Sequence, residues 1–265
     1  MAAKYETQAT QRPESMRPFR QRMAELHRRI EGRHLACARL HRLHALRLQR
    51  WYISDQATLR PVFMAAVAQH LGMDCAAVTL FGQTGEELLV AASDGIARAA
   101  HDLELLIGEG PARDVVGGRE FVAADGADMT MRWPQYGPAL TELGVQSVVA
   151  VPLPSARLLG ALCVFTSRAG LRTEITPAAE TVADALANTL LLASHGTADD
   201  GAPQGTLFDD ADYLAVVHQA VGMVAVQCGC DLDTALALLR ARAFAGGSAV
   251  SEIARRVLED GYQLC

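Results

Sequence analysis

The sequence predicts an α+β fold in which an antiparallel sheet flanked by helices is followed by an all-helical bundle. Two pairs of apolar segments, each pair joined by a short polar turn, are typical of β-hairpins. Helical patterns precede and follow these hairpins instead of alternating with single strands, which excludes a doubly wound parallel sheet. Residues 207–265 contain three short helical patterns and no strand pattern, so we expect them to form a separate bundle.

The composition excludes several classes of protein. The chain has 265 residues, of which 50% are hydrophobic, enough for one or two domains with extensions. It has no run of about 18 uncharged apolar residues, so we expect no transmembrane helix and no membrane partner. The polar, arginine-rich start argues against a secretory signal. The six cysteines are scattered, and only Cys228 and Cys230 are close, at a spacing that zinc sites do not use. We therefore expect a cytoplasmic protein with free thiols and no metal site.

The charge is distributed unevenly along the chain. The net charge is −6, but residues 1–50 hold twelve Lys and Arg against four Asp and Glu, which is +8 and leaves −14 for the rest. A basic arm on an acidic body indicates contact with nucleic acid, with an acidic partner or with the body itself. The alternative is a solvated helical extension without a partner.

The first fifty residues divide into two segments. Residues 1–18 contain Pro13 and Pro18 and little periodicity, which predicts a disordered arm. Residues 19–52 form a basic helical extension, in which apolar residues recur at steps of three, four and five. This imperfect stripe would allow pairing with a partner helix, so we expect a homodimer.

The sheet domain spans residues 53–195 and is followed by a linker, 196–206, rich in Gly, Pro and Asp. Its first half predicts a helix over 55–71 capped by Ser54 or Asp55, strands over 75–81 and 87–93, helices over 98–107 and 111–117, and a strand over 119–123. Its second half predicts a helix that ends at Gly144, strands over 146–153 and 158–165, and a helix over 176–193 that Thr176 caps. We expect the helices to group on one side of the sheet.

The first helix of the bundle, over 209–228, has one apolar stripe. Its members follow steps of three and four residues: Leu214, Val217, Val221, Val224 and Cys228. Ala220 and Met223 widen the apolar arc, which fits either burial in a bundle or a second face for a partner helix.

The other two helices of the bundle are marked by their ends. The second begins after Asp231 or Asp233, both good N-caps, and stops at Gly246-Gly247. The third is opened by Ser248 or Ser251.

Two families share motifs with this chain. The sheet domain resembles a GAF domain of bacterial sensors in four strings: Leu106-IGEGPARDVV-116, Arg132-WP-134, Gly144-VQSVVAVPL-153 and Leu159-GALCVF-165. The bundle resembles an ANTAR domain in the following positions: Gln219-AVGMVA-225, Ala235, Leu239-Arg240, Ala243 and Ser251-EIARRV-257. The order GAF then ANTAR is itself a recurrent architecture.

The resemblance implies an RNA-binding regulator of transcription and not an enzyme. ANTAR domains are similar to one another in forming a three-helix bundle that holds paired stem-loops in nascent transcripts. Stabilising those hairpins prevents a terminator from forming, which is antitermination. The GAF part would be the signal input. The sequence identifies no cofactor, and a small-molecule ligand of the GAF part is compatible with the resemblance.

The candidate RNA-binding residues all lie in the bundle: Gln219, Gly222, Arg240, Arg242, Arg255 and Arg256. The planar fork of arginine binds phosphate through two hydrogen bonds and stacks on exposed bases. The bundle holds four arginines against eight acids, a net charge of −4, so RNA affinity depends on a local patch of arginines. The helical pattern turns Arg255 and Arg256 outward, and clustering of all four arginines with Gln219 would favour RNA binding. The alternatives are solvated arginines and, for Gly222, close helix packing.

His101 and Trp133 are candidates for lining a ligand pocket in the GAF part, and the alternatives are a surface or capping histidine and a packing tryptophan. Cys75 and Cys163 fall in apolar strands and are interpreted as buried small hydrophobes. No Ser-His-Asp set, metal-ligand cluster or pair of catalytic carboxylates is evident, so we expect no catalytic residue. A second hypothesis is a ligand-sensing or protein-interaction regulator whose ANTAR-like bundle mainly mediates dimerisation.

Overall fold

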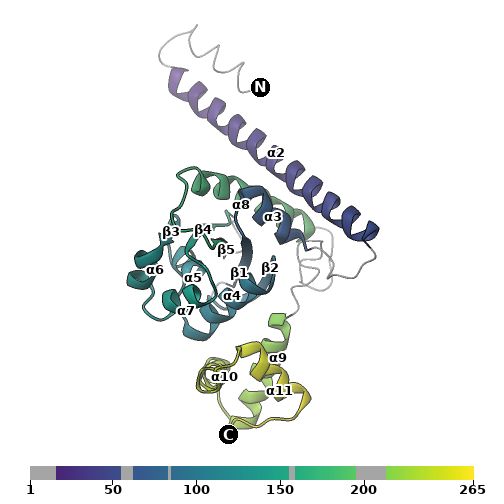
Figure 1. The fold of residues 1–265 in the computed structure, drawn as a ribbon, viewed down its shortest axis with the longest axis vertical. Helices are drawn as coiled ribbons and strands as arrows, with labels where there is room; N and C mark the ends of the chain where they lie inside the picture. Colours follow the sequence, from purple (N-terminus) through teal and green to yellow (C-terminus); the bar gives the residue numbers. More distant parts are fainter. Residues whose placement is uncertain (1–15, 55–61, 83–84, 155–158, 195–212) are drawn as a thin grey trace.

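The computed structural model describes residues 16–54, 62–82, 85–154, 159–194 and 213–265 (Figure 1). In chain order the elements are α2 (Arg17–Ile53), α3 (Phe63–Leu71), β1 (Cys75–Phe81), β2 (Glu87–Ala92), α4 (Gly95–Ile107), α5 (Pro111–Val116), β3 (Val122–Asp125), α6 (Gly126–Arg132), α7 (Tyr136–Glu142), β4 (Ser147–Pro152), β5 (Leu159–Thr166), α8 (Ile175–Ser194), α9 (Tyr213–Cys228), α10 (Leu232–Gly246) and α11 (Val250–Glu259). The arm up to residue 15, the cap at Asp55 and the linker 196–206 lie outside the described residues.

The five strands form one sheet in the order β2-β1-β5-β4-β3, and every neighbouring pair is antiparallel. The predicted α+β fold class is therefore confirmed. Strand β1 lies inside the sheet and all seven of its residues are buried, which explains its uninterrupted apolar sequence. In its register with β5, Cys75 lies opposite Phe165 and Ala77 lies opposite Cys163.

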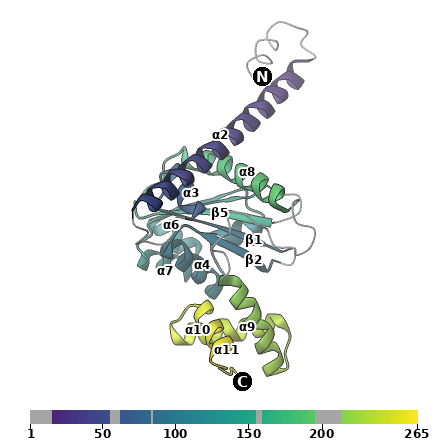
Figure 2. The same ribbon diagram turned by 90° about the vertical axis from the view of Figure 1, so that its right-hand side faces the viewer.

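Helices cover both faces of the sheet, so the expectation that they group on one side is wrong (Figure 2). One face packs on α3, α8 and Leu40 of α2. The other face packs on α4, α5, α6 and α7. The physical reason is the burial of β1 and β5 on both sides, because an apolar face of a sheet needs cover.

Several element boundaries differ from the predicted ones. Helix α4 begins three residues early because the carboxylate of Asp94 accepts a hydrogen bond from the Ala97 main-chain N–H at 2.9 Å. Strand β3 runs from Val122 to Asp125, and α6 directly after it was not predicted. Ser54 ends α2 instead of opening the next helix, and its main-chain N–H bonds the carbonyl of Arg50 at 3.0 Å.

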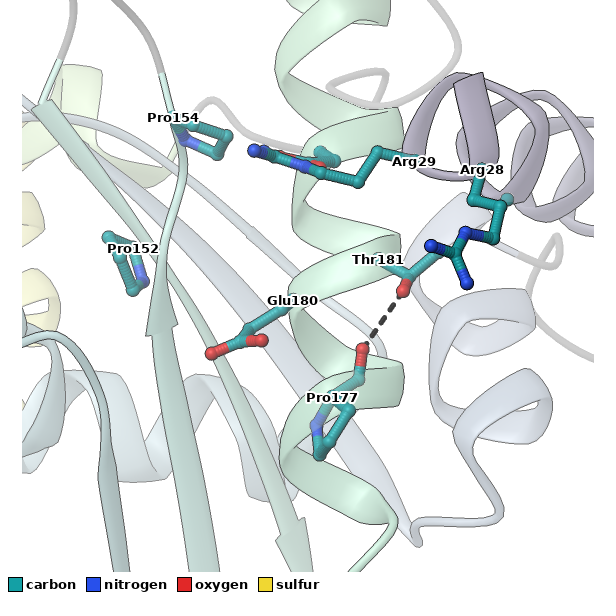
Figure 3. A pocket seen from close by; sticks show the side chains of 9 residues that line it. Arg28, Arg29, Pro152, Pro154, Pro177, Glu180 and Thr181 are labelled. Carbon is teal, nitrogen blue, oxygen red and sulfur yellow. Dashed lines mark hydrogen bonds and ion pairs between the residues drawn. The ribbon is translucent and has the colours of Figure 1, made fainter. Parts of the chain in front are cut away.

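The long helix α2 lies along α3 and α8 (Figures 1 and 2). It begins at Arg17, before the predicted residue 19, because a proline in the first turn needs no N–H partner. A groove of about 510 Å³ separates α2 from α8 (Figure 3). It is lined by Arg28 and Arg29 on one side and by Glu180 and Asp184 on the other, and Arg29 pairs with Asp184 at 3.4 Å. The opposite charges on the two walls are consistent with packing of α2 against α8.

Helices α9, α10 and α11 form the predicted bundle. Asp231 caps α10 by accepting a hydrogen bond from the Thr234 N–H at 2.7 Å, and the helix ends at Gly247 with a φ of 60°. Helix α11 has Ala249 at its N-cap, and Ser251 is buried within its first turn. Neither predicted serine therefore caps this helix.

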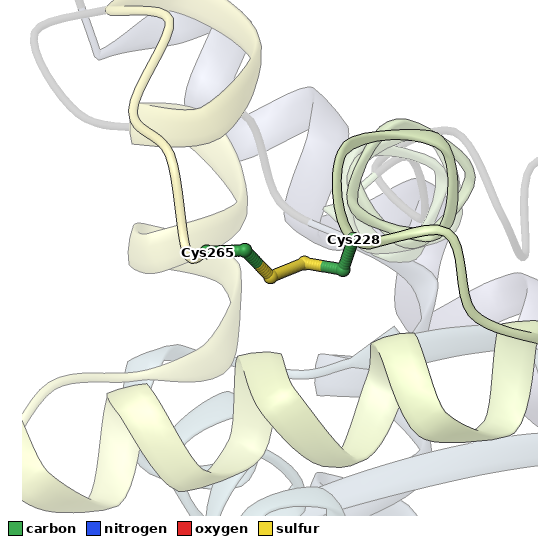
Figure 4. Close-up of a disulfide and its surroundings, with 2 residues drawn as sticks. All are labelled: Cys228 and Cys265. Atoms are coloured by element: carbon green, nitrogen blue, oxygen red, sulfur yellow. A yellow bond between two sulfur atoms is a disulfide. The ribbon is translucent and has the colours of Figure 1, made fainter.

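The segment that follows α11 folds back onto α9. Cys265 forms a disulfide with Cys228, the last residue of α9 (Figure 4). The expectation of free thiols is therefore wrong for these two residues. They are 37 positions apart, and only the tertiary fold of the bundle brings them together.

Candidate functional site

The bundle packs against the sheet domain through α4 and β2, and we call this contact the junction. One apolar cluster contains Val90 of β2 and Leu105 of α4 together with the side chains of the bundle core. Both residues are buried, at 0% and 3% exposure. The junction is therefore a continuous apolar core and not a polar contact between two separate surfaces.

Arg240 of α10 makes the most specific polar contact of the junction. Its Nε donates to the main-chain carbonyl of Leu106 at 3.0 Å. This carbonyl lies in the last turn of α4, where carbonyls lack helical partners and the helix dipole favours a cation. A Cβ at Gly108, which has a φ of 85°, would overlap the Arg240 guanidinium. Glycine at this position therefore serves both the backbone turn and the approach of Arg240.

Beside this contact lies a buried ionic group that we call the Glu87 cluster: Glu87, His101 and Arg113. Glu87 is only 6% exposed, its Oε2 lies 2.8 Å from Nε2 of His101, and its Oε1 accepts from Arg113. Burial alone would lower the pKa of His101, but the Glu87 carboxylate outweighs it and raises that pKa. Burial would raise the pKa of Glu87, but His101 and Arg113 lower it. Both side chains are thus favoured in their charged forms.

The Glu87 cluster also touches the bundle. Nε2 of His218, on α9, lies 2.7 Å from the main-chain oxygen of Glu87 and donates to it in the tautomer that carries the Nε2 proton. The start of β2 therefore joins an internal ion pair of the sheet domain to a helix of the bundle.

A second buried carboxyl lies next to the cluster. Oε1 of Glu104 accepts from the main-chain N–H of Arg113 at 2.8 Å. Burial raises the pKa of Glu104 to about 7, although the hydrogen bond from Arg113 opposes this shift. A Cβ at Gly110 would overlap the Glu104 carboxyl group. The two glycines of the Gly-Glu-Gly string thus make room for one side chain each, Gly108 for Arg240 and Gly110 for Glu104.

The residue between these glycines ties the string to the helices behind it. Oε1 of Glu109 accepts from the main-chain N–H groups of Gln135 and Tyr136, at 2.7 and 2.8 Å, where α7 begins. We call Gly108–Gly110 the connecting loop, because it contacts the bundle on one side and α7 on the other.

The sequence of the sheet domain decides the family. Residues 57–193, more than half of the chain, match the family model of the GAF domain. The chain belongs to the GAF domain family. Its GAF domain thus includes the sheet, the helices on both faces and the connecting loop, and the family supports a role in signal sensing.

Solved structures give more distant matches. Escherichia coli SdiA has 11% sequence identity, with a TM-score of 0.39 over 74% of this chain and 87% of that chain. The photoproduct state of GAF3 from Slr1393 of Synechocystis sp. PCC6803 has 17% identity, with a TM-score of 0.35 over 51% and 94%. The phycocyanobilin-bound GAF domain of a cyanobacterial phytochrome has 14% identity, with a TM-score of 0.36 over 64% and 98%. No curated protein matches the chain.

The face of the sheet under α4 to α7, behind the connecting loop, holds two buried aromatic side chains that carry polar groups. The rings of Trp133 and Tyr136 meet edge to face at 5.8 Å, and both residues are buried. Nε1 of Trp133 and Oη of Tyr136 have no hydrogen-bond partner among the described residues. Because a buried donor without a partner costs about 1–3 kcal/mol, these two groups indicate a place where an acceptor would be stabilising.

The two predicted pocket residues have different roles in the GAF domain. Trp133 belongs to the core cluster between the sheet and α4 to α7, whereas His101 is buried in the Glu87 cluster. The alternative of a surface or capping histidine is therefore wrong. The thiols of Cys75 and Cys163 lie in the same core cluster as Trp133, and burial raises the pKa of Cys75 to about 12 and also raises the pKa of Cys163. Both are buried hydrophobes, as interpreted from the sequence.

The four predicted arginines do not cluster on one face but divide into two groups, so the arrangement that would favour RNA binding is not found and the hypothesis of a bundle that mainly mediates dimerisation gains support. Arg240 faces the GAF domain, whereas Arg242 and Arg256 lie over the ring of Tyr262, at 5.5 and 4.4 Å from its centroid. Arg255 is exposed, and its charge acts on Asp102 of α4. Residues two positions apart on a helix point in opposite directions, which separates Arg240 from Arg242.

The two predicted residues of α9 lie at the surface. Gln219 is exposed, and Gly222 is partly exposed. A Cβ at Gly222 would meet nothing within 4 Å. Close helix packing therefore does not explain this glycine.

Sequence reasoning missed four polar residues at or beside the junction: Glu87, Glu104, Arg113 and His218. Two of them had a visible signal. Glu87 begins an otherwise apolar strand, and Glu104 interrupts the apolar residues of the helix over 98–107. A carboxylate in such a place is buried only with a partner, which the sequence could have indicated.

Neither a membrane span nor a metal site is found in the described part of the chain. No single helix there is long and apolar enough to cross a membrane, and α9 with α10 passes that test only as a pair bent by 104°. No group of three or more His, Cys, Asp and Glu residues there could hold a metal ion.

Proposed function

We propose that this protein is an RNA-binding transcriptional regulator that acts by antitermination, with the GAF domain as signal input and the bundle as an ANTAR-type output module. The observation that carries the proposal is the contact of Arg240 with Leu106, because it joins a candidate RNA-binding residue to the sensor domain. In this proposal the docked bundle is the resting form. The partner is a stem-loop in a nascent transcript, and the protein acts in the cytoplasm.

The connecting loop supplies a physical route for the signal. A small molecule that accepts hydrogen bonds from Trp133 and Tyr136 would shift the start of α7, which Glu109 ties to the loop. The loop directly follows the last turn of α4, which presents the Leu106 carbonyl to Arg240. Loss of this contact would free Nε and the buried side of the Arg240 guanidinium, so that the whole fork could bind a phosphate group through two hydrogen bonds.

The test of RNA binding is a gel shift with a paired-hairpin RNA. We expect the double variant Arg255→Ala/Arg256→Ala to bind more weakly and to lower the slope of log K against log salt by about 2. The matched control is Arg119→Ala/Arg172→Ala, because both arginines are exposed in the GAF domain, outside the bundle and the basic segment 1–50. Circular dichroism should show an unchanged helix content. Equal affinity of both double variants would contradict the assignment.

A second candidate function is a ligand-sensing or protein-interaction regulator whose bundle mainly mediates dimerisation. It is favoured by apolar side chains on the outside of α9, where Val226 is 84% exposed and Met223 is 40% exposed. Exposed leucines on α2, Leu26 and Leu35, support a homodimer under either function. Sedimentation and gel shift separate the two functions: a wild-type dimer that Val226→Glu dissociates, in a protein that does not bind paired-hairpin RNA, would support the second.

A further inference from the structure

The segment after α11, residues 260–265, covers two of the four arginines of the bundle, Arg242 and Arg256. Tyr262 packs its ring against Arg242 and Arg256, and its main-chain N–H donates to the carbonyl of Arg256 at 3.1 Å. Tyr262 and Leu264 also pack against the bundle core, although both stay partly exposed. These few contacts and one covalent bond, the Cys228–Cys265 disulfide, hold the segment (Figure 4).

The cation–π contacts bear directly on ligand binding. A guanidinium that lies on a tyrosine ring has lost one of its flat faces, and the approach of a base or a phosphate to that side is blocked. Arg242 and Arg256 are both on the exposed side of the bundle, away from the Arg240 contact. The position of Tyr262 therefore decides whether two of the four arginines are fully available to an anionic ligand.

We propose that Cys228 and Cys265 form a reversible thiol–disulfide site whose oxidation fixes residues 260–265 across Arg242 and Arg256 and whose reduction releases them. The oxidant is a low-molecular-weight disulfide, and the reductant is the corresponding thiol. The consequence for RNA rests on the proposed function, whereas the thiol chemistry and the release of the segment do not.

The reaction balances as two thiol–disulfide exchanges. Cys265 is the more exposed of the two residues, so its thiolate attacks one sulfur of the small disulfide, and the other half leaves as a thiolate. The Cys228 thiolate then attacks the Cys265 sulfur of the mixed disulfide and expels the second small thiolate. Two cysteine thiols are oxidised and one small disulfide is reduced to two thiols, which take up the two protons. Reduction runs through the same mixed disulfide in reverse.

The other cysteines of the chain serve as internal controls. Cys75 and Cys163 are buried and their pKa values are raised, so they are inert to exchange at neutral pH. Cys37 and Cys230 are partly exposed and form no disulfide. Cys230 is the sharper control, because it lies two residues from Cys228 in the same bundle.

The first experiment measures the chemistry on the full-length protein. The protein is equilibrated in glutathione buffers of increasing oxidised fraction, the free thiols are alkylated, and each cysteine is quantified by mass spectrometry. We expect Cys228 and Cys265 to become protected together at one ratio, in Cys230→Ser as in the wild type. Amide hydrogen exchange of residues 260–265 should accelerate at least about tenfold on reduction, since the disulfide then no longer holds the segment on the bundle. The proposal would be overturned if Cys228 and Cys265 were alkylated at every glutathione ratio, or if the hydrogen exchange of residues 260–265 did not change on reduction.

The second experiment measures the effect on an anionic ligand, with paired-hairpin RNA as the probe. We expect the reduced protein and Cys265→Ser to bind about tenfold more tightly than the oxidised protein. Tyr262→Ala should bind tightly in both states, because no ring then covers the arginines. Cys230→Ser should respond to reduction like the wild type. A protein that binds RNA with one affinity in both states overturns the control of the arginines. A protein that binds no RNA, but whose segment is released on reduction, overturns the proposed function and leaves the thiol site standing.

Discussion

The two faces of the sheet are equally buried but differ in their chemistry. The face under α3 and α8 packs through a cluster of 21 buried apolar residues. The face under α4 to α7 adjoins two buried acids, Glu87 and Glu104, and contains the polar groups of Trp133 and Tyr136. Among the described residues, the first side also buries the polar side chains of Ser147, Thr166 and His44 but no acid. We call it the dry side, and we call the side with the buried acids the polar side.

This difference separates stability from function. Burial of a polar group costs free energy unless it is hydrogen-bonded, so a face that only stabilises the fold is best built from apolar residues. The polar side retains charged groups, and it is also the side that carries the connecting loop and the bundle. We infer that α3 and α8 hold the domain together while α4 to α7 transmit its signal.

The largest expected effect compares one residue from each side. Glu87→Ala should lower the free energy of unfolding by about 3–5 kcal/mol, because it leaves His101 and Arg113 without their carboxylate. Leu186→Ala, on the dry side, should cost about 2–5 kcal/mol through the cavity that it opens. Urea unfolding measures both. Hydrogen exchange should show that only Glu87→Ala loosens α9, and equal loosening in the two variants would remove the distinction.

The second prediction uses the proton of Glu104. Glu104 holds this proton up to a pKa of about 7 in the folded protein, whereas the ordinary pKa of a glutamate in the unfolded chain is 4.5. The folded state therefore binds more protons between these values, and stability falls by about 3 kcal/mol as pH rises through this window. Glu104→Gln keeps the acceptor for Arg113 but carries no titrating proton, so this loss should disappear.

Urea midpoints at pH 5 and pH 8 measure the effect of Glu104→Gln. His101 adds a loss of the same sign, because its raised pKa stabilises the fold at low pH and the contribution fades as pH rises through that pKa. That part remains in the variant. Glu252→Gln, an exposed carboxyl on α11, is the control. A slope as steep in Glu104→Gln as in the wild type would show that another group carries it.

The third prediction concerns the space beside Gly108. Gly108→Ala should cost about 1–3 kcal/mol from its positive φ and should also displace Arg240. Gly144→Ala is the matched control, because Gly144 has almost the same φ, 86°, with nothing within 4 Å of its Cβ. In an Arg240→Ala background the cost of Gly108→Ala should fall to that of Gly144→Ala. A cost unchanged by Arg240→Ala would mean that the guanidinium does not fill this space.

The smallest expected effect compares two helix caps. Asp94→Ala and Asp231→Ala should each cost about 1 kcal/mol, since each removes one hydrogen bond to an N-terminal N–H. Their location should differ, with Asp94→Ala speeding hydrogen exchange on both sides of the junction and Asp231→Ala speeding it in α10. If faster hydrogen exchange in the Asp94 variant were confined to α4, this helix would not transmit the destabilisation to the bundle.

Local patterns predicted most of the fold, because the relevant forces act between near neighbours. The hairpins followed from apolar runs and turn residues, and the end of α10 followed from Gly247. The helices on both faces were missed because an apolar strand does not reveal how many of its sides are covered. The serine cap predicted for α11 was wrong because Ser251 is drawn into the bundle core and Ala249 stands at the N-cap.

The site was less predictable because its contacts join distant parts of the chain. Arg240 and Leu106 are 134 positions apart, and His218 and Glu87 are 131 apart. The sequence identified Arg240 and the Gly-Glu-Gly string separately, each from a different family motif. Only the fold shows that the arginine lies against the first glycine of the string.

The apolar core shared by Val90, Leu105 and the bundle has a consequence for how the molecule melts. Two domains that are joined only by a flexible linker unfold independently of each other. Here either part, if opened, would expose core side chains of the other to water, so the two gain cooperativity from each other. We expect one calorimetric transition for both, and a bundle cut away from its sensor should tend to aggregate.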